Sequence, residues 1–394
     1  MKVLVVGAGI TGVMTAYYAY KKGFDVTIVD QHGIAIKCSY ANGGQISVCN
    51  SQVWNTWSNL AKAITWLGRE NAPLLIRPDL DLEKYSWLMK FSREIILGTA
   101  DVNTARTIDL GLQSRKLYAE IMLEIDKLEQ LSNIEYNGIL HIYTDLADYK
   151  QALNRTTFFK NLGLTWQDVP ASKLSKLEPS LLGFGSNLMG GILTPEDFTG
   201  DIHRFCVHVL TWLQAKGVRY IPAVINTKDE LLDKFPSNFY ILSTGTELQK
   251  QAQWFDTNLD IYPVKGYSLT IEAPADNIPK VSLLDEKAKI VSSRLGNRFR
   301  VAGTAEFTGH DDSINSNRLK PLYAWVQKNF SLIDTSKAKE WACLRPMRPN
   351  MLPVWGKFKS TSNVFYHGGH GHLGWTLAPY TAKQIVESIT KGKK

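Results

Sequence analysis

The chain has 394 residues, of which 44% are hydrophobic and 21% are charged, and this balance excludes a disordered or fibrous protein. One hydrophobic core stops growing at roughly 250 to 300 residues, so we expect about two domains. The net charge of +8 is spread thinly, which suits an anionic ligand or membrane surface and does not favour nucleic-acid binding. The four cysteines have no CxxC pair or regular spacing, which favours a reducing compartment.

The N-terminus begins with an uncharged stretch, residues 3–20, whose hydropathy is also typical of a signal peptide or a short membrane span. Its three glycines lie where a signal peptide has a leucine-rich centre. Residues 2–6 form a β-rich apolar run, residues 10–22 have helical length, and residues 25–29 form a second β-branched run. We therefore expect a βαβ unit of a buried parallel sheet and no cleaved signal.

The rest of the chain alternates between helical and strand patterns. Residues 54–67 and 103–131 have apolar residues at spacings of three and four, which predicts an amphipathic helix packed on the core and a long helix of a second domain. Strand patterns occur at residues 134–143, 264–271, 289–293 and 298–302, the last two flanking a hairpin turn. Passages from helix to strand or strand to helix recur at residues 201–221, 239–242 and 364–391.

These patterns predict an α/β plus α+β fold, in which a Rossmann-like nucleotide-binding domain carries an inserted substrate domain with a mixed β-sheet. Because the αβ patterns lie at both ends and in the middle, the nucleotide-binding domain is expected to be discontinuous. Its expected segments are residues 1–80, 196–250 and 341–394. The expected substrate domain comprises residues 81–195 and 251–340.

A glycine-rich motif, Gly7-Ala8-Gly9-Ile10-Thr11-Gly12, joins the first expected strand to the first expected helix. The first glycine permits a tight turn, the second admits a pyrophosphate close to the backbone, and the third allows helix and strand to pack closely. Asp30, at the end of the next strand, is placed to bind a ribose diol. The alternative is a glycine turn that binds no ligand.

A second glycine loop, residues 369–374, lies between the last expected strand and the last expected helix. No acidic residue follows it at the spacing that a second dinucleotide needs, so we expect its helix N-terminus to face an anionic group of the same cofactor. A reduced flavin carries such a charge, which favours FAD over NAD. The alternative is a metal cluster of His367, His370 and His372, for which nearby partner ligands are missing. We expect no metal.

Two arginines, Arg345 and Arg348, are held between prolines in Leu344-Arg345-Pro346-Met347-Arg348-Pro349. A rigid guanidinium suits bidentate capture of a carboxylate. In an extended segment the two side chains point to opposite faces, so we assign a functional role to Arg345 and a structural role to Arg348.

Six motifs together resemble the FAD-dependent D-amino-acid dehydrogenases, within the superfamily of D-amino-acid oxidase, glycine oxidase and sarcosine oxidase. They follow one another in the family's order over nearly the whole chain. The motifs are residues 7–12, 39–47, 195–201, 263–270, 344–349 and 371–376.

The resemblance implies a set of FAD-binding residues and a substrate site. Residues 371–374 would cover flavin O2, Gly245 would let the backbone pass the cofactor, and Arg345 would bind the substrate carboxylate, with Tyr267 as a second catalytic residue. The expected FAD-binding residues are Gly7, Gly9, Ile10, Thr11, Gly12, Asp30, Gln31, Ser39, Asn42, Gly43, Gln45, Ile46, Val224, Gly245, Gly371, His372, Leu373, Gly374, Trp375 and Thr376.

The activity implied is oxidative deamination of D-amino acids to keto acids and ammonia, by hydride transfer to N5 of FAD. Electrons would pass to a respiratory quinone or a similar acceptor. One departure from the family is a short segment at residues 224–240, where relatives carry a longer strand and hairpin. Two alternatives therefore stay open: oxidation of glycine or a secondary amine such as sarcosine or proline, and a flavoprotein subunit that has lost turnover.

The resemblance also implies a cytoplasmic protein, with peripheral contact to the cytoplasmic face of the inner membrane as a further expectation. One apolar stripe offers a means of attachment, since tryptophan-bearing helices with basic flanks suit an anionic bilayer surface. Lys62 and Arg69 are its basic neighbours. The stripe consists of Trp54, Trp57, Leu60, Ala61, Ile64 and Leu67.

Overall fold

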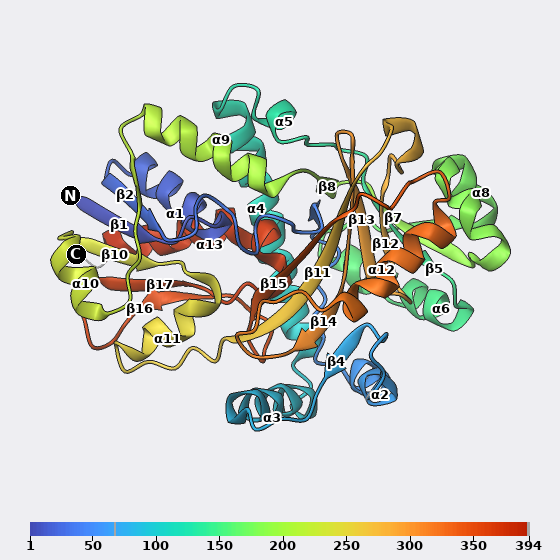
Figure 1. Cartoon of the computed structure of the whole chain (residues 1–394), viewed down its shortest axis with the longest axis horizontal. Helices are drawn as coiled ribbons and strands as arrows, with labels where there is room; N and C mark the ends of the chain where they lie inside the picture. Colours follow the sequence, from blue (N-terminus) through green and yellow to red (C-terminus); the bar gives the residue numbers. More distant parts are fainter. Residues whose placement is uncertain (67, 392–394) are drawn as a thin grey trace.

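A mainly parallel sheet is formed around the N-terminal strand (Figure 1). The computed structural model of the chain describes residues 1–66 and 68–391. Strand β1 (Lys2–Val6), helix α1 (Ile10–Lys21) and strand β2 (Asp25–Asp30) form the predicted βαβ unit. The uncharged N-terminal stretch is therefore a central strand and the helix packed on it.

This first sheet has the strand order β16-β17-β10-β1-β2-β9. Strands β10 (Phe239–Leu242), β17 (Val364–Gly368) and β9 (Arg219–Pro222) run parallel to β1, and β16 (Val354–Lys357) is antiparallel at the edge. The three distant αβ passages of the sequence thus share one sheet, as predicted. Within the described residues, no helix is long and apolar enough to cross a membrane.

A second, mixed sheet has the order β15-β11-β14-β13-β12-β5-β7-β6, with β4 added beside β14. The predicted hairpin is confirmed, since β13 and β14 pair antiparallel across Gly296. A separate two-stranded sheet joins β3 (Gln45–Ile46) to β8 (Phe198–Thr199). The strands of the second sheet are β4 (Leu74–Ile76), β5 (Ile139–Tyr143), β6 (Gln167–Pro170), β7 (Gly190–Thr194), β11 (Tyr262–Glu272), β12 (Ser282–Asp285), β13 (Ile290–Leu295), β14 (Arg298–Phe307) and β15 (Lys339–Met347).

Helices cover both sheets, and two of them, α2 and α3, lie apart at the lower edge of the molecule in Figure 1. The remaining helices are α2 (Trp57–Trp66), α3 (Leu82–Ile96), α4 (Ala100–Glu124), α5 (Leu128–Leu131), α6 (Leu146–Asn154), α7 (Thr156–Asn161), α8 (Ala171–Leu177), α9 (Ile202–Ala215), α10 (Lys228–Lys234), α11 (Leu248–Gln253), α12 (Ser316–Asn329) and α13 (Gly374–Lys391).

The long helix α4 does not belong wholly to the second domain, contrary to the sequence-based expectation. Its C-terminal half places Tyr118, Ile121 and Met122 in the core around α1, α9 and α13 of the first sheet, whereas Ile108 packs in a cluster beside β5 and β7. Helical periodicity shows which face is apolar but not which sheet that face covers. The helix therefore connects the two halves.

The segment between α2 and β4 also departs from the expected boundary at residue 80. Strand β4 pairs in parallel with β14, so residues 74–76 belong to the second sheet. Helix α2 has no buried residue, and Trp57 and Ile64 on its surface are 65% and 60% exposed. The expectation that residues 54–67 pack on the core is therefore wrong for α2, although Trp54 before it packs against an apolar cluster of the second sheet. Leu67, the last residue of the predicted stripe, lies outside the described residues.

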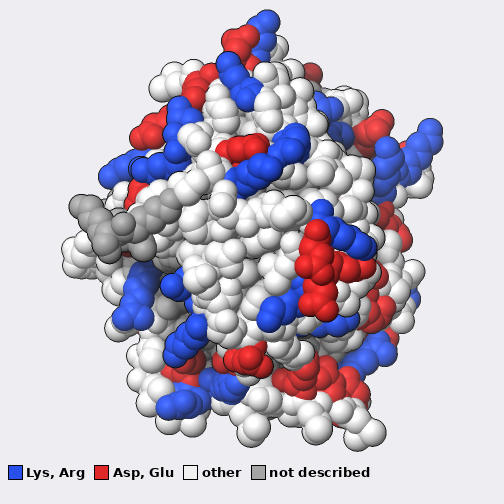
Figure 2. Space-filling model, turned by 90° about the vertical axis from the view of Figure 1, so that its left-hand side faces the viewer, with Lys and Arg blue, Asp and Glu red and all other residues white. Residues whose placement is uncertain are grey.

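The short segment at residues 224–240 forms the helix α10, capped by Thr227, whose side chain accepts a hydrogen bond from Glu230 N. Leu231 anchors α10 in the core beside Leu4 and Val6 of β1. Figure 2 shows the face that carries α10 and both chain termini, where charges of both signs are interspersed around a largely uncharged centre. The positive charge excess is therefore not gathered into one patch on this face.

Candidate active site

The carboxyl ends of the parallel strands open into a cavity of about 1210 Å³ between the two sheets. Its volume exceeds the roughly 300 to 1,000 Å³ of a typical small-molecule site, which leaves room for a cofactor and a substrate together. The predicted site residues that line it are Gly7, Gly9, Ile10, Thr11, Asp30, Gln31, Ser39, Asn42, Gly43, Gln45, Gly245, Tyr267, Arg345, Gly371, His372, Leu373, Gly374, Trp375 and Thr376. Gly12, Ile46 and Val224 are not part of this lining.

The first glycine loop divides its functions among three positions. Gly7 has φ +105°, and a Cβ there would lie 2.4 Å from the carbonyl oxygen of Ser243, so this turn requires glycine. A Cβ on Gly12 would lie 1.8 Å from the carbonyl oxygen of Gly7, so Gly12 serves close packing and does not reach the cavity. A Cβ on Gly9 would meet only Ser39 Oγ at 3.5 Å. The space at Gly9 is therefore open toward the cavity.

The N-terminus of α1 offers donors to that space, because its N-cap residue, Gly9, has no side chain to cap it. Ser39 Oγ accepts the N–H of Ile10 at 3.1 Å and ties the loop after β2 to this helix. The uncapped first turn and the open space at Gly9 form a cradle that fits a pyrophosphate.

Asp30 lies at the carboxyl end of β2, as expected, but its carboxylate is partly engaged within the protein. Oδ1 accepts the backbone N–H groups of His32 and Gly33 at 2.7 and 3.0 Å, and Oδ2 accepts that of Ala8 at 2.7 Å. Each carboxylate oxygen can accept two hydrogen bonds, so Oδ2 keeps one position for a hydroxyl.

The loop between β2 and β3 runs along the cavity on the side of the second sheet. A Cβ on Gly43 would lie 2.6 Å from a methyl group of Val291, so the loop can approach β13 only with glycine there. Gln45 donates from Nε2 to Ser282 Oγ at 2.8 Å, which fixes its side chain at the wall. Ile46 is fully buried in the core and supports the loop from behind.

The second glycine loop is held by a buried network of histidine and threonine side chains. His367 bonds Thr15 through Nδ1 at 2.9 Å and Thr381 through Nε2 at 2.8 Å, and His370 Nε2 bonds Thr381 at 2.9 Å. Burial lowers the pKa of His370 to about 3, so the ring is neutral. These rings anchor the loop between α1 and α13. Among the described residues, no group of three potential ligands is arranged to hold a metal ion.

His372 faces the cavity from the second glycine loop and stacks on Trp54, with ring centroids 4.7 Å apart. Burial, with the nearby charge of Arg345, lowers the pKa of His372 to about 3. Neither of its buried ring nitrogens has a hydrogen-bond partner within the described residues. A neutral ring with free nitrogens next to the arginine suits contact with a bound polar group.

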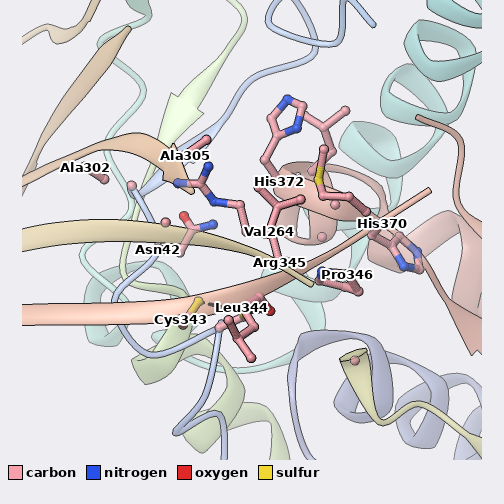
Figure 3. A pocket seen from close by; sticks show the side chains of 18 of the residues that line it. Asn42, Val264, Ala302, Ala305, Cys343, Leu344, Arg345, Pro346, His370 and His372 are labelled. Atoms are coloured by element: carbon pink, nitrogen blue, oxygen red, sulfur yellow. Dashed lines mark hydrogen bonds between the residues drawn. The ribbon is translucent and has the colours of Figure 1, made fainter. Parts of the chain in front are cut away.

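Arg345 projects into the cavity from β15, as Figure 3 shows, with its guanidinium toward Asn42 and Ala305. It has no carboxylate partner among the described residues, unlike most partly buried arginines. Burial lowers its pKa, yet a guanidinium stays protonated at neutral pH. A fixed, unpaired guanidinium inside a cavity is a site for a carboxylate ligand.

Arg348 has the structural role expected for it. Its Nε donates to the carbonyl of Leu259 at 2.9 Å, and its Nη1 to that of Leu352 at 3.3 Å. Its side chain also covers Gly369, where a Cβ would lie 2.7 Å from Arg348 Cδ. Arg348 therefore joins loops behind the second glycine loop.

Two expected site residues are placed differently. The Tyr267 hydroxyl donates to Glu306 Oε2, and its ring packs with Leu269 and Leu322 on the face of the sheet that α12 covers. Burial and this carboxylate raise the pKa of the phenol. Strand alternation puts the Tyr267 side chain on the face opposite Gly266, against which Arg345 lies. Tyr267 still borders the cavity, so its catalytic role stays a prediction.

Val224 is 49% exposed, and its neighbours Ala223 and Ile225 line the cavity instead. The predicted role of Val224 in FAD binding stays a prediction, since the residues on both sides of it border the cavity. Gly245 does border the cavity, with φ +64° and open space around its Cα.

Gly266 has a role that was not predicted from the sequence, although glycine inside a strand is a signal of close approach. A Cβ at Gly266 would lie 2.1 Å from Arg345 Nη2, so this glycine makes the space in which the guanidinium lies. An apolar cluster was also missed. It borders the arginine and includes Val53, Val264, Ala305, Met347 and Trp87.

The uncapped helix, the open space at Gly9 and the second glycine loop fit a dinucleotide that extends from Asp30 to Arg345. Such a site defines a dinucleotide-dependent oxidoreductase class. The family described as FAD dependent oxidoreductase matches residues 2–388. The chain belongs to this family, and its cofactor is FAD.

Similarity to individual proteins extends over the full length. D-amino acid dehydrogenase 3 of Mesorhizobium japonicum is 39% identical, with 98% of this chain and 97% of the relative covered. D-amino acid dehydrogenase of Paramagnetospirillum magneticum is 35% identical over 100% of this chain and 96% of its own length. Glycine oxidase from Geobacillus kaustophilus shares the fold, with a TM-score of 0.75, 16% identity, and 100% and 95% of the two chains covered.

Proposed function

We propose that this protein catalyses the oxidative deamination of D-amino acids to keto acids and ammonia. The observation that carries the proposal is the unpaired guanidinium of Arg345, which lies in the cavity beside the apolar cluster and below the second glycine loop. Two full-length relatives named D-amino acid dehydrogenase support the same substrate class.

FAD supplies the acceptor for the hydride that leaves the substrate Cα. The protein orients the substrate, because Arg345 holds the substrate carboxylate at a fixed point. Holding two reactants in a productive geometry provides a large part of an enzymatic rate. The start of α1 would hold the pyrophosphate of FAD, and residues 371–376 would lie against its flavin end. No general base is needed when the amine binds in its neutral form, and the imino acid then hydrolyses in water.

The apolar wall favours a substrate that has a side chain over glycine or sarcosine. Val264 is the pairing partner of Arg345 across the strands, and Val53, Met347 and Ala305 belong to the same cluster. Residues of this kind bind an aliphatic or aromatic group at the Cα and would leave a void beside glycine.

Steady-state oxidation of an amino-acid panel with an artificial dye acceptor tests the proposal. We expect turnover of D-amino acids with apolar side chains, and little turnover of their L-enantiomers, glycine, sarcosine or proline. Preferred turnover of glycine or a secondary amine would overturn the substrate assignment. If the FAD-loaded protein oxidises none of these substrates, it is a flavoprotein subunit without activity of its own.

We further propose that electrons pass to a membrane quinone and that α2 and α3 bring the protein to the cytoplasmic membrane surface. Helix α3 exposes Leu82, Met89 and Ile96 at helical spacing, with 81%, 68% and 72% of each exposed, and α2 exposes Trp57 and Ile64. Apolar helix faces of this size suit the boundary between headgroups and acyl chains.

Other residues of the same two helices line the cavity, namely Leu60 and Trp66 of α2 and Leu88 and Phe91 of α3. A lipid-soluble quinone could therefore enter between them. Lys62, a basic residue of α2, is paired with Asp148 at 3.0 Å and is therefore less available to anionic lipids. Insertion of the apolar side chains is then the main source of affinity for the membrane.

Sedimentation with anionic vesicles tests the membrane contact. The variant Ile64→Asp/Met89→Asp should remain in the supernatant while the natural protein pellets. Leu123→Asp is the matched control, because Leu123 is 88% exposed on α4. Equal sedimentation of all three proteins would contradict this attachment surface. Rapid formation of peroxide with no reduction of a quinone analogue would reclassify the protein as an oxidase.

A further inference from the structure

Two cysteines that lie far apart in the sequence, Cys38 and Cys343, meet beside the substrate arginine. Their Sγ atoms are 2.7 Å apart, against about 2.05 Å in a disulfide bond, so little movement separates the pair from a covalent link. Cys38 lies in the loop after β2, and its Sγ also lies 2.6 Å from the carbonyl oxygen of Leu344. Cys343 lies on β15, two residues before Arg345.

The pair is accessible from the cavity, which both cysteines line. Both are partly exposed, whereas Cys206 is fully buried in the helical core, and Cys49, which also borders the cavity, is only 3% exposed. All four cysteines lie within the described residues and none is in a disulfide. Cys38 and Cys343 are therefore the thiols that a small reagent in the cavity can reach together.

The surroundings of the pair are positively charged. Cys343 and Arg345 point to the same face of β15 because side chains alternate along a strand. The guanidinium lies against Gly266, and Gly266 is the pairing partner of Cys343, so the charge is held next to its sulfur. Lys37, the residue before Cys38, is paired with Asp312 at 2.9 Å, so Arg345 is the main positive charge beside the pair. Positive charge beside a thiol favours the reactive thiolate.

The two sulfurs are not equivalent. The Cys38 thiol donates a hydrogen bond to the Leu344 carbonyl at 2.6 Å, whereas Arg345 lies next to Cys343. Contact with Cys38 lowers the pKa of Cys343 against the effect of burial, and the charge of Arg345 acts in the same direction as that contact. Contact with Cys343, together with burial, raises the pKa of Cys38. Cys343 is thus the sulfur that attacks first and Cys38 the one that resolves the product.

We propose that Cys38 and Cys343 form a redox-active dithiol, which reacts with low-molecular-weight disulfides and closes to a disulfide beside Arg345. In the first step the Cys343 thiolate attacks one sulfur of the small disulfide. The small S–S bond breaks, a mixed disulfide forms on Cys343, and one small thiolate leaves. In the second step Cys38, after losing its proton, attacks Cys343 Sγ and displaces the other small thiolate.

The balance is two electrons and two protons. The two protein thiols are oxidised to one disulfide, the small disulfide is reduced to two thiols, and the two cysteine protons end on the released thiolates. The new bond joins the loop after β2, which borders the cofactor side of the cavity, to the strand that carries the substrate arginine.

Closure also constrains the substrate site, and this consequence rests on the proposed function. The disulfide would tie β15, which carries Arg345 two residues after Cys343, to the loop after β2. Because a small displacement of a positioning residue weakens substrate binding, the KM for a D-amino acid should change by about threefold to tenfold, with a smaller change in kcat. Restoring the thiols with dithiothreitol should restore the original KM.

The covalent step can be tested without turnover. The FAD-loaded enzyme is incubated with glutathione disulfide and analysed by intact mass and peptide mapping. We expect a loss of two hydrogens and a cross-link between the peptides of Cys38 and Cys343, reversed by dithiothreitol. Cys38→Ser should instead accumulate a glutathione adduct on Cys343, and Cys343→Ser should stay unmodified. Cys206→Ser is the matched control and should form the same cross-link as the natural protein.

Absence of the cross-link, or adducts on Cys49 or Cys206 instead, would overturn the dithiol. An adduct that accumulates in Cys343→Ser and not in Cys38→Ser would overturn the assigned order of attack. A cross-link that leaves KM unchanged on an active enzyme would overturn the effect on substrate binding. An inactive protein that still forms the cross-link would contradict the proposed function and support the dithiol.

Discussion

The guanidinium of Arg345 lies directly on the backbone of Gly266. A Cβ built at Gly266 would be 2.1 Å from Nη2 and 2.3 Å from Cζ of the arginine. The contact arises because β11 and β15 pair antiparallel and place Gly266 opposite Cys343, one step along from Arg345 on the same face. A glycine in the middle of an eleven-residue strand therefore sets the position of the arginine.

Gly266→Ala should displace the guanidinium and leave the rest of the strand intact. We expect the transition-state stabilisation calculated from kcat/KM to fall by about 1 to 3 kcal/mol, the usual cost of forcing a methyl group into a packed site. Most of the change should be in KM. FAD content measured from the flavin absorbance should be unchanged. A normal KM together with a lowered melting temperature would show that the glycine serves packing alone.

Arg345→Ala removes the proposed carboxylate partner. Truncating one partner of a buried charged pair costs about 3 to 5 kcal/mol. We expect a loss of about this size in the transition-state stabilisation calculated from kcat/KM for a D-amino acid. FAD content should survive. Arg348→Ala is the comparison, because its donors are used by the Leu259 and Leu352 carbonyls and its loss should lower stability more than efficiency. The opposite pattern would mean that the wrong arginine is assigned to the substrate.

The parts that the sequence predicted well are those set by local pattern. The βαβ unit at the N-terminus, the hairpin of β13 and β14 and the final strand, glycine loop and helix each follow from periodicity and turn residues within a short stretch. The structural roles of Gly7 and Gly12 could be predicted in the same way. Gly12 contacts Gly7 in the same loop, and Gly7 contacts Ser243 at the end of the adjacent strand.

The parts that it missed depend on partners far along the chain. Cys38 and Cys343 are separated by 305 positions, and neither has a local signal of the other. The pattern of α2 shows an apolar stripe, but only the finished fold leaves Trp57 exposed. Tyr267 stands in a motif of the family resemblance, yet strand alternation turns its hydroxyl to Glu306 on the opposite face. Such placements are missed where tertiary contacts decide the position of a side chain.

The two glycines at the start of α1 should respond differently to alanine. Gly9→Ala should fold normally, because its Cβ meets only Ser39 Oγ at 3.5 Å, but should bind FAD more weakly since the methyl group occupies the cradle. Gly12→Ala should lose about 1 to 3 kcal/mol of stability, because its Cβ would lie 1.8 Å from a backbone oxygen. Thermal unfolding of the apoproteins and FAD titration separate the two effects. Equal loss of apoprotein stability in both variants would contradict the division of roles.

The buried neutral histidine His370 should make the protein sensitive to acid. Burial lowers its pKa from 6.5 to about 3, so below pH 6.5 the unfolded chain binds a proton that the folded protein does not. The contribution of His370 to the free energy of unfolding is therefore complete above pH 6.5. It falls as the pH drops toward 3, by about 1.4 kcal/mol per pH unit for this one group.

His370→Gln removes the group that titrates, and the unfolding free energy of this variant should fall less steeply over this interval. Identical slopes in the natural protein and His370→Gln, measured by urea unfolding between pH 7 and 5, would show that His370 titrates as it does in the unfolded chain.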